Sequence, residues 1–238
     1  MKSDEKTPQV SRSRLGWMIV VRFALAIASI DLLLFGAAGR FDWPQAWWLT
    51  ALFAATFLIG GPWVLRRDPD LLVERMNTSP PNVPRWDRIV LLVYRLLIVG
   101  LFVIAALDAA RYRWSHVPLL LQTGGAVAIV AAVCGIGWCV SVNHFLASYA
   151  RLQPDRGQSV VQDGPYRFVR HPMYTSAITM MFGVPLLLGS WLALVPAALI
   201  GTLFVVRTRL EDAMLTDGLE GYRAYARRVP NRLVPGVW

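Results

Sequence analysis

Charged residues are scarce in this chain. Asp, Glu, Lys and Arg together make up 16% of the 238 residues, whereas hydrophobic residues make up 55%. A soluble domain carries about a quarter charged residues, so this chain lacks the polar side chains needed to cover a surface that faces water on all sides. The composition therefore excludes an ordinary soluble domain and predicts a membrane protein.

Cysteine is also rare, and the common metal and nucleotide motifs are missing. Cys134 and Cys139, the two cysteines, lie in one apolar run and about 140° apart on a helix, so they cannot form a disulfide with each other. The chain has no HExxH motif and no Cys/His cluster, so we expect no catalytic metal. It has no GxGxxG between a strand and a helix, which argues against a Rossmann-type cofactor site.

The net charge of +9 does not indicate a nucleic-acid partner. The basic residues lie in short clusters between apolar runs and not along one soluble face. We therefore expect the charge to report membrane topology, and we expect no nucleic acid among the partners of this chain.

Long apolar runs predict an all-α, polytopic membrane helix bundle. Runs able to cross the hydrocarbon core, which takes about 20 residues, cover 17–38, 43–65, 88–107 and 117–141. The region 172–207 is too long for one crossing and is interrupted by Gly189 and Ser190, which favours two shorter helices joined by a tight turn. We expect about six crossings, or five plus a re-entrant hairpin. The first run lacks a convincing cleavage site, so we expect a transmembrane helix and not a secretory signal.

The basic residues also predict the orientation of the bundle. With the N-terminus in the cytoplasm, 19 of the 24 basic residues lie on the cytoplasmic side, three lie outside and two lie within the runs. Cytoplasmic loops carry such an excess of Lys and Arg. We therefore expect an integral membrane protein of the bacterial inner membrane with both termini in the cytoplasm.

The distribution of apolar and polar segments divides the chain into two parts. Residues 1–142 hold four spans and a cytoplasmic loop at 66–87, in which "DPDLLVERM" is a possible short interfacial helix. Residues 143–238 hold a polar loop, the helix hairpin and a tail that breaks near Gly218 and resumes as a short amphipathic helix before Pro230.

Three ionisable side chains lie inside the spans, where such residues are candidates for function. Asp31 lies toward the outer side, and we expect it to make a structural hydrogen bond to a neighbouring helix. Arg22 and Arg95 lie within a turn or two of the cytoplasmic boundary, from which long side chains can reach the interface.

The stretch "GPYRFVRHPMYTS" at 164–176 is the richest polar segment. Pro172 suits the first turn of a helix, and a helix N-terminus attracts an anion such as a carboxylate. His171 and Tyr174 are three residues apart and therefore share a face. The alternative is a positive-inside cluster with an interfacial tyrosine.

A second polar pair lies at the end of the next helix. Arg207 and Glu211 are four residues apart and could form a simple helix ion pair. In an antiparallel hairpin, however, they would converge with His171 and Tyr174 into one pocket. A zwitterionic amino acid suits that set, and the preceding stretch 157–166, with apolar Val160 and Val161, suits a flat heterocycle. S-adenosylmethionine fits this description, although other ligands do too.

The order of these motifs resembles a known family. Asn143, Gln153, "GPYRFVRHPMY", "RTRLED" and "GYRAYARRV" follow one another as in the isoprenylcysteine carboxyl methyltransferase family and the related membrane phospholipid methyltransferases. The resemblance covers about 143–238. In the first half, "DPDLLVER" and "WDR" look like bacterial-type members.

The resemblance implies an integral membrane methyltransferase that binds S-adenosylmethionine at the cytoplasmic face and takes a lipophilic or lipidated acceptor from the bilayer. Arg207 would orient the acceptor. The residues that would contact the cofactor are Gln153, Gln158, Ser159, Val160, Val161, Tyr166, His171, Pro172, Met173, Tyr174 and Glu211. Asp212 departs from the family, in which two glutamates are common.

The acceptor stays open at this point. A carboxylate is already a nucleophile at neutral pH and needs only orientation, whereas an amine needs a base, for which His171 or Glu211 would serve. Prenylated cysteine, an aminophospholipid or another apolar acid all suit a site at the membrane boundary. Two other functions are possible: a membrane sterol-type reductase that uses NADPH, and a membrane scaffold without enzymatic activity.

Overall fold

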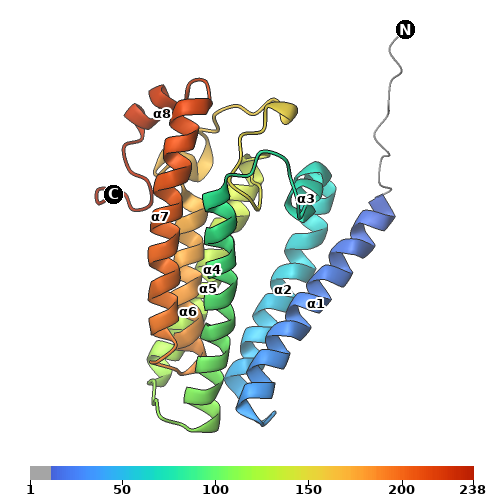
Figure 1. The fold of residues 1–238 in the computed structure, drawn as a ribbon. Coiled ribbons are helices and arrows are strands. Elements are labelled where there is room, and N and C mark those ends of the chain that lie inside the picture. Colours follow the sequence, from blue (N-terminus) through green and yellow to red (C-terminus); the bar gives the residue numbers. More distant parts are fainter. Residues whose placement is uncertain (1–11) are drawn as a thin grey trace.

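The computed structural model describes residues 12–238, which form eight α-helices and, within that range, no strand (Figure 1). A π-helical segment, η1 (Ala106–Arg111), extends α4, and two short 3-10 turns, η2 (Pro154–Arg156) and η3 (Gly164–Arg167), follow α5. The predicted all-α class is confirmed. The helices are α1 (Arg12–Ala38), α2 (Pro44–Arg67), α3 (Pro69–Met76), α4 (Arg85–Ala105), α5 (Leu119–Val142), α6 (Pro172–Leu188), α7 (Leu194–Gly218) and α8 (Tyr222–Arg228).

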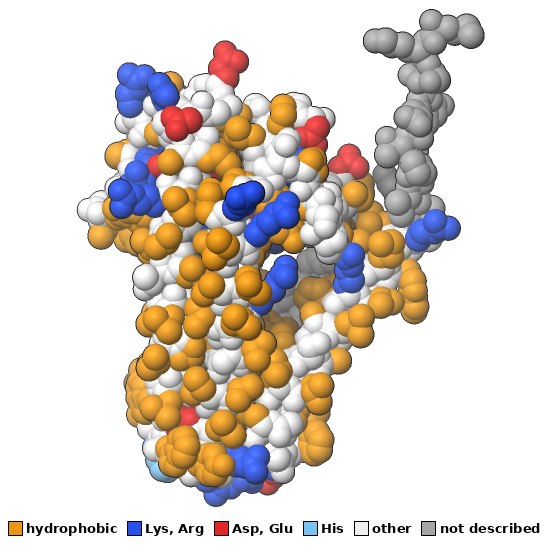
Figure 2. Space-filling model, viewed as in Figure 1, with side chains coloured by type: hydrophobic (Ala, Val, Ile, Leu, Met, Phe, Trp, Pro, Cys, Tyr) orange, Lys and Arg blue, Asp and Glu red, His pale blue; other side chains and the backbone are white. Residues whose placement is uncertain are grey.

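Four of these helices are long and apolar enough to cross a bilayer. The spans begin at residues 13, 44, 85 and 119 and are between 24 and 27 residues long, which exceeds the 20 or so that a crossing needs. Apolar side chains cover their outer faces, and the charged side chains gather toward the two ends of the molecule (Figure 2). The four predicted spans are confirmed, and the chain is an integral membrane protein.

The predicted helix hairpin is also present. Gly189 ends α6 with a φ of +85°, a conformation that favours glycine, and α7 begins at Leu194. At the tip, Ser190 Oγ donates to Asp108 Oδ2 of η1 at 2.5 Å. The tip therefore lies at the end of α4, and α6 and α7 run along the length of the bundle (Figure 1). The number of crossings stays a prediction, six or five plus a re-entrant hairpin, because α6 is shorter than the four long apolar helices.

Glycine permits the closest helix pair, α5 with α6. A Cβ on Gly125 would lie 2.6 Å from the carbonyl oxygen of Gly183, and a Cβ on Gly183 would lie 2.8 Å from that of Gly125. Small residues at such crossings let two membrane helices approach until their backbones touch. The core around this contact contains buried Ile129 of α5 and Val184 of α6.

Apart from η1, the short elements lie together at one end of the bundle, the end that carries the N-terminus of α6 (Figure 1). Asp68 caps α3 by accepting from Leu71 N at 2.9 Å, as the predicted 68–76 helix requires. The tail breaks at Gly218 and resumes as α8, again as predicted.

The polar residues inside the spans have the following partners. Thr50 Oγ1 of α2 donates to Asp31 Oδ1 at 2.6 Å, which confirms the predicted structural hydrogen bond. Arg22 donates to the carbonyl oxygen of Met76 at 2.7 Å and so reaches the end of α3. Lys2 and Lys6, two of the basic residues counted for the orientation, lie outside the described residues.

Candidate active site

The N-terminus of α6 begins at Pro172, as predicted, and is held by the C-terminal segment. Arg170 N donates to the carbonyl oxygen of Asn231 at 3.0 Å, and His171 N donates to that of Arg232 at 2.9 Å. Within the first turn, the N–H groups of Tyr174 and Thr175 both donate to the His171 carbonyl. Pro172 has no N–H, so this helix end offers an anion fewer donors than the sequence predicts.

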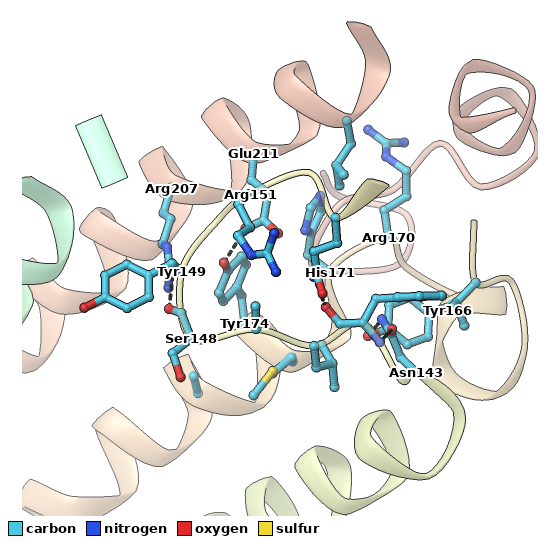
Figure 3. A pocket seen from close by; sticks show the side chains of 18 of the residues that line it. Asn143, Ser148, Tyr149, Arg151, Tyr166, Arg170, His171, Tyr174, Arg207 and Glu211 are labelled. Carbon is cyan, nitrogen blue, oxygen red and sulfur yellow. Dashed lines mark hydrogen bonds between the residues drawn. The ribbon is translucent and has the colours of Figure 1, made fainter. Parts of the chain in front are cut away.

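The hairpin brings the start of α6 next to the end of α7. The Tyr174 hydroxyl donates to Glu211 Oε2, and the rings of His171 and Tyr174 are stacked with centroids 5.8 Å apart. The Arg207 guanidinium lies over the Tyr174 ring, 5.3 Å from its centroid. The predicted convergence of these four side chains is therefore present (Figure 3).

Arg207 does not form the simple helix ion pair with Glu211 that was the alternative. Its Nε donates to Asp87 Oδ1 of α4 at 2.8 Å, and its Nη2 donates to the carbonyl oxygen of Ser148 at 3.1 Å. Asp87 also accepts from Ala150 N at 2.8 Å. The side chain of Arg207 is thus oriented by α4 and by the loop after α5, whereas Glu211 is held by Tyr174.

A cavity of about 460 Å³ lies between these groups, within the roughly 300–1,000 Å³ typical of small-molecule sites. Pro172 is buried in the first helical turn and is not on the cavity wall. The other predicted residues all line the cavity: Gln153, Gln158, Ser159, Val160, Val161, Tyr166, His171, Met173, Tyr174, Arg207 and Glu211.

Gln153 and Gln158 hold the loop that forms one wall of the cavity. Gln153 is 1% exposed; its Nε2 donates to the carbonyl oxygen of Phe145 at 2.7 Å, and its Oε1 accepts from Arg156 at 2.7 Å. Gln158 Oε1 accepts from the backbone N–H of Gln153 at 2.8 Å. Each side chain thus already has a polar partner within the loop.

Tyr166 joins this wall to α5. Its hydroxyl accepts from Asn143 Nδ2 at 2.8 Å, and its carbonyl oxygen accepts from the Tyr225 hydroxyl of α8 at 2.8 Å. Burial raises the pKa of the Tyr166 phenol, so it stays neutral at physiological pH. A neutral phenol can donate to a ligand or accept from one.

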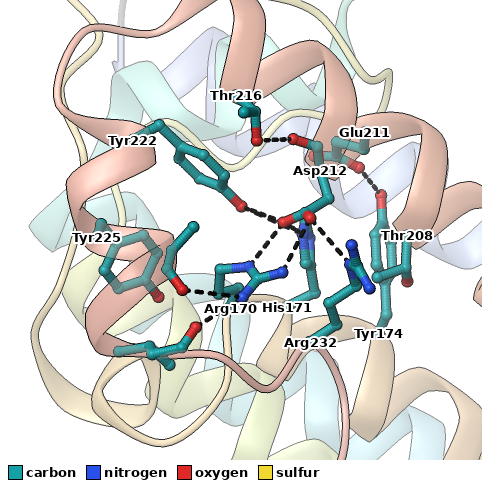
Figure 4. Close-up of polar contacts among 12 residues, drawn as sticks. Arg170, His171, Tyr174, Thr208, Glu211, Asp212, Thr216, Tyr222, Tyr225 and Arg232 are labelled. Carbon is teal, nitrogen blue, oxygen red and sulfur yellow. Dashed lines mark hydrogen bonds and ion pairs between the residues drawn. The ribbon is translucent and has the colours of Figure 1, made fainter. Parts of the chain in front are cut away.

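Asp212, the position that departs from the family, is the centre of a buried polar cluster (Figure 4). Arg170 donates to both of its carboxylate oxygens, at 2.7 and 2.9 Å. The Tyr222 hydroxyl donates at 2.8 Å and Arg232 Nε at 2.9 Å, while His171 Nε2 lies 3.3 Å away. Asp212 does not line the cavity, but Arg170 and His171 do.

These contacts lower the pKa of Asp212, which lies beyond the apolar part of α7. Burial by itself would raise this pKa, but hydrogen bonds from His171 and Arg170, together with those from Arg232 and Tyr222, outweigh it. The carboxylate therefore stays charged and keeps His171 and the Arg170 guanidinium in place. Asp212 thus contacts two residues of the cavity wall and does not reach the cavity itself.

Three residues from the first half of the chain belong to the site or support it and were not predicted from the sequence. Asp87 holds Arg207, and Glu74 accepts two hydrogen bonds from Arg151, at 2.9 and 3.0 Å. Arg75 is the third and lines the cavity. All three fall in "DPDLLVER" and "WDR", so the family resemblance of these motifs was the available signal. Among residues 12–238, no group of three or more His, Cys, Asp or Glu is placed to hold a metal ion.

Two comparisons with known proteins bear on this arrangement. Residues 121–219 match the phospholipid methyltransferase family. Over 143 residues the chain is 30% identical to the cobalt-zinc-cadmium resistance protein CzcN of Cupriavidus metallidurans, an overlap of 58% of this chain and 60% of that relative. The chain thus spans about three fifths of the length of this curated relative.

The family match begins in α5 and ends just after α7. It therefore includes the whole hairpin, with the start of α6 and the end of α7. The resemblance predicted from the motif order is confirmed: residues 121–219, which contain most of the site, match the phospholipid methyltransferase family.

Proposed function

We propose that this protein is a membrane methyltransferase that uses S-adenosylmethionine and acts on a lipophilic acceptor, as the isoprenylcysteine carboxyl methyltransferases do. The observation that carries the proposal is the meeting of His171, Tyr174, Arg207 and Glu211 around one cavity at the end of the α6–α7 hairpin. The family of residues 121–219 supports methyl transfer as the reaction.

The residues present fit the proposed cofactor. The Glu211 carboxylate lines the cavity and would face the ammonium group of an amino acid, while Val160 and Val161 line it with apolar surface suited to a heterocycle. Tyr166 and His171 add groups that can hydrogen-bond. The bound sulfonium would supply an activated methyl group.

Positioning then supplies most of the catalysis, because the donor is already activated. A lone pair on the acceptor forms the bond to the methyl carbon while the carbon–sulfur bond breaks. A carboxylate acceptor has no proton to lose, and Arg207, held by Asp87, would orient it through charge-assisted hydrogen bonds. An amine acceptor must lose a proton, for which His171 and Glu211 are the groups at hand.

We also propose that the end of the bundle that holds the cavity faces the cytoplasm of a bacterium. The excess of arginine in the segments at this end supports that orientation. A soluble cofactor would then enter from the cytosol and a lipophilic acceptor from the bilayer. Labelling of single cysteines introduced at Asp217 and at Arg113 by a membrane-impermeant reagent tests this, with labelling of intact cells expected only at position 113.

The test of function measures cofactor binding and turnover by purified protein in lipid vesicles. S-adenosylmethionine is expected to bind wild-type protein, and Glu211→Ala and His171→Ala are expected to abolish binding. Glu220→Ala and His116→Ala are matched controls, since both residues are exposed and lie outside the cavity. Undiminished binding by both site variants, if folded, would refute the site. Binding of NADPH in place of S-adenosylmethionine would refute the function.

Radiolabelled S-adenosylmethionine with a lipid extract then identifies the acceptor. The label is expected in an extractable lipid or lipidated product. Alkaline treatment separates the two acceptor chemistries, because a methyl ester releases methanol whereas an N-methyl group does not. Label that never leaves the cofactor in wild-type protein, with any lipid extract, would contradict a lipophilic acceptor.

A further inference from the structure

Five arginines line the main cavity, and they differ in their partners. Arg151, Arg170 and Arg207 each hydrogen-bond a carboxylate, at distances between 2.7 and 3.2 Å. Arg75 and Arg95 have no carboxylate partner among residues 12–238. The cavity therefore contains two guanidinium groups that form no ion pair within the described chain.

Arg75 is half-buried and lies in the last turn of α3. Its contact is with a thioether: Nη1 lies 4.0 Å from the Sδ of Met173, next to Tyr174. Burial, and to a smaller degree the nearby Arg207, lowers the pKa of Arg75, although a guanidinium stays protonated at neutral pH. A cation that is partly removed from water and has no anionic partner is unfavourable, so the position favours the arrival of an anion.

Arg95 lines both the main cavity and a second cavity next to it. A second, smaller cavity of about 130 Å³ shares Leu91, Arg95 and Tyr149 with the main one. Its wall adds Arg88, which is exposed, seven residues before Arg95 and thus on the same face of α4. Arg88, like Arg95, has no carboxylate partner in the described chain. Arginine side chains border a hollow on this face of the molecule (Figure 2).

The surroundings of these side chains indicate what the anion is attached to. Arg95 belongs to a membrane-spanning helix, and apolar Val83, Pro80 and Leu91 line the smaller cavity beside it. A guanidinium binds phosphate or carboxylate through two parallel hydrogen bonds. These arginines lie near the N-terminal end of α4, next to apolar cavity walls. Such surroundings suit an anionic headgroup that is attached to a hydrocarbon chain.

We propose that Arg88, Arg95 and Arg75 form an arginine track that binds the anionic headgroup, a phosphate or a carboxylate, of the lipophilic acceptor and leads it from the membrane side of α4 to the reactive centre beside Tyr174. This inference rests on the proposed function, which supplies the identity of the bound lipid as the acceptor. None of the residues predicted to contact the cofactor lines the smaller cavity, so the outer end of the track at Arg88 lies apart from them, whereas Arg75 lies in the main cavity among them.

The test measures lipid binding by purified protein in a non-ionic detergent, without cofactor. The probes are phosphatidic acid, oleic acid and the uncharged diacylglycerol, each with a fluorescent chain. Wild-type protein is expected to prefer an anionic probe to diacylglycerol by about tenfold or more, because a hydrogen bond to a charged group is worth that much. Arg75→Gln and Arg95→Gln are each expected to reduce the preference about tenfold, and Arg88→Gln by less because Arg88 lines only the smaller cavity.

Arg85→Gln is the matched control, since Arg85 is exposed on the same helix and lines neither cavity. Arg95→Lys keeps the charge and is expected to keep most of the preference, which separates loss of binding from misfolding. The preferred probe, phosphatidic or oleic acid, identifies the headgroup. If Arg75→Gln and Arg95→Gln keep the wild-type preference for the anionic probe over diacylglycerol, the track is overturned. It is also overturned if inorganic phosphate binds as tightly as the lipids.

A parallel titration with S-adenosylmethionine separates this inference from the proposed function. Cofactor affinity is expected to stay within about twofold of wild type in Arg95→Gln. Loss of cofactor affinity with an unchanged lipid preference would assign these arginines to the cofactor and overturn the track. If wild-type protein binds anionic lipid through the arginines but binds no S-adenosylmethionine, the proposed function fails and the lipid site stands.

Discussion

Arg207 and Asp87 lie 120 residues apart in the sequence and are joined by a buried hydrogen bond of 2.8 Å between Nε and Oδ1. Asp87 is fully buried, and its second oxygen accepts from Ala150 N at 2.8 Å. One carboxylate of α4 thus holds both the arginine that faces the cavity and the loop that closes one side of it. The two halves of the chain meet at this pair.

Replacement of Asp87 tests whether this pair positions the arginine. Asp87→Ala leaves Arg207 buried without a counter-charge, which costs about 3–5 kcal/mol of unfolding free energy for a broken buried pair. Asp87→Asn keeps the shape and an acceptor oxygen and is expected to fold, but to lower kcat about tenfold or more while the Kd for S-adenosylmethionine stays near wild type. A parallel loss of cofactor affinity would show that Asp87 supports the cofactor instead.

The Tyr174 hydroxyl gives a second prediction. Tyr174→Phe removes the donor to Glu211 and keeps the ring that packs against His171 and Arg207. Because the carboxylate loses its orientation and a hydrogen bond worth about 1.5–3 kcal/mol, cofactor affinity is expected to fall about tenfold or more by calorimetry. Tyr112→Phe, at an exposed position on the opposite end of the bundle, serves as the control and is expected to bind as wild type.

The Asp212 cluster predicts a dependence of stability on pH. The folded-state pKa of Asp212 lies below its ordinary value of 3.8, so the stabilisation is complete above that value and is lost as the pH falls below it. We expect the melting temperature of detergent-solubilised wild type to fall below about pH 4. Asp212→Asn is expected to melt lower at neutral pH and to lose less on acidification. Equal acid sensitivity in the two proteins would place the titrating group elsewhere.

The glycine contact between α5 and α6 gives a matched pair of variants. Gly125→Ala would place a Cβ 2.6 Å from backbone atoms of Gly183 and Leu187, so the helices must separate. Overpacking of this kind costs about 1–3 kcal/mol or more. Gly124→Ala, one residue away, meets no atom within 4 Å and is expected to leave the melting temperature unchanged or slightly raised. Similar melting of both variants would contradict the close helix pair.

Much of the fold was predictable because it depends on local physics. Apolar runs of sufficient length predict the four spans, Gly189 with Ser190 predicts the turn, and Pro172 predicts the first residue of α6. The convergence of Tyr174 and Glu211 was also predictable, since two antiparallel helices joined by a short turn must bring the start of one beside the end of the other.

The partners of the site could not be predicted in the same way. Helix spacing allowed Arg207 to pair with Glu211 four residues on, yet Arg207 pairs with Asp87. Hydropathy shows that a helix spans the membrane but does not show which neighbours it packs against or how it is rotated. Both depend on side-chain fit and on close contacts such as that of Gly125 with Gly183.

The sequence by itself determined an all-α membrane bundle and the helix boundaries near the site, and it pointed to most of the residues that line the cavity. These features were readable because length, periodicity and helix-breaking residues act over short distances. Only the tertiary structure decided that Asp87 holds Arg207 and that Asp212 binds Arg170 outside the cavity. It also decided that Arg75, from the first half of the chain, lines the cavity. These relationships join residues that are 41 to 120 positions apart, and the packing of whole helices brings them together.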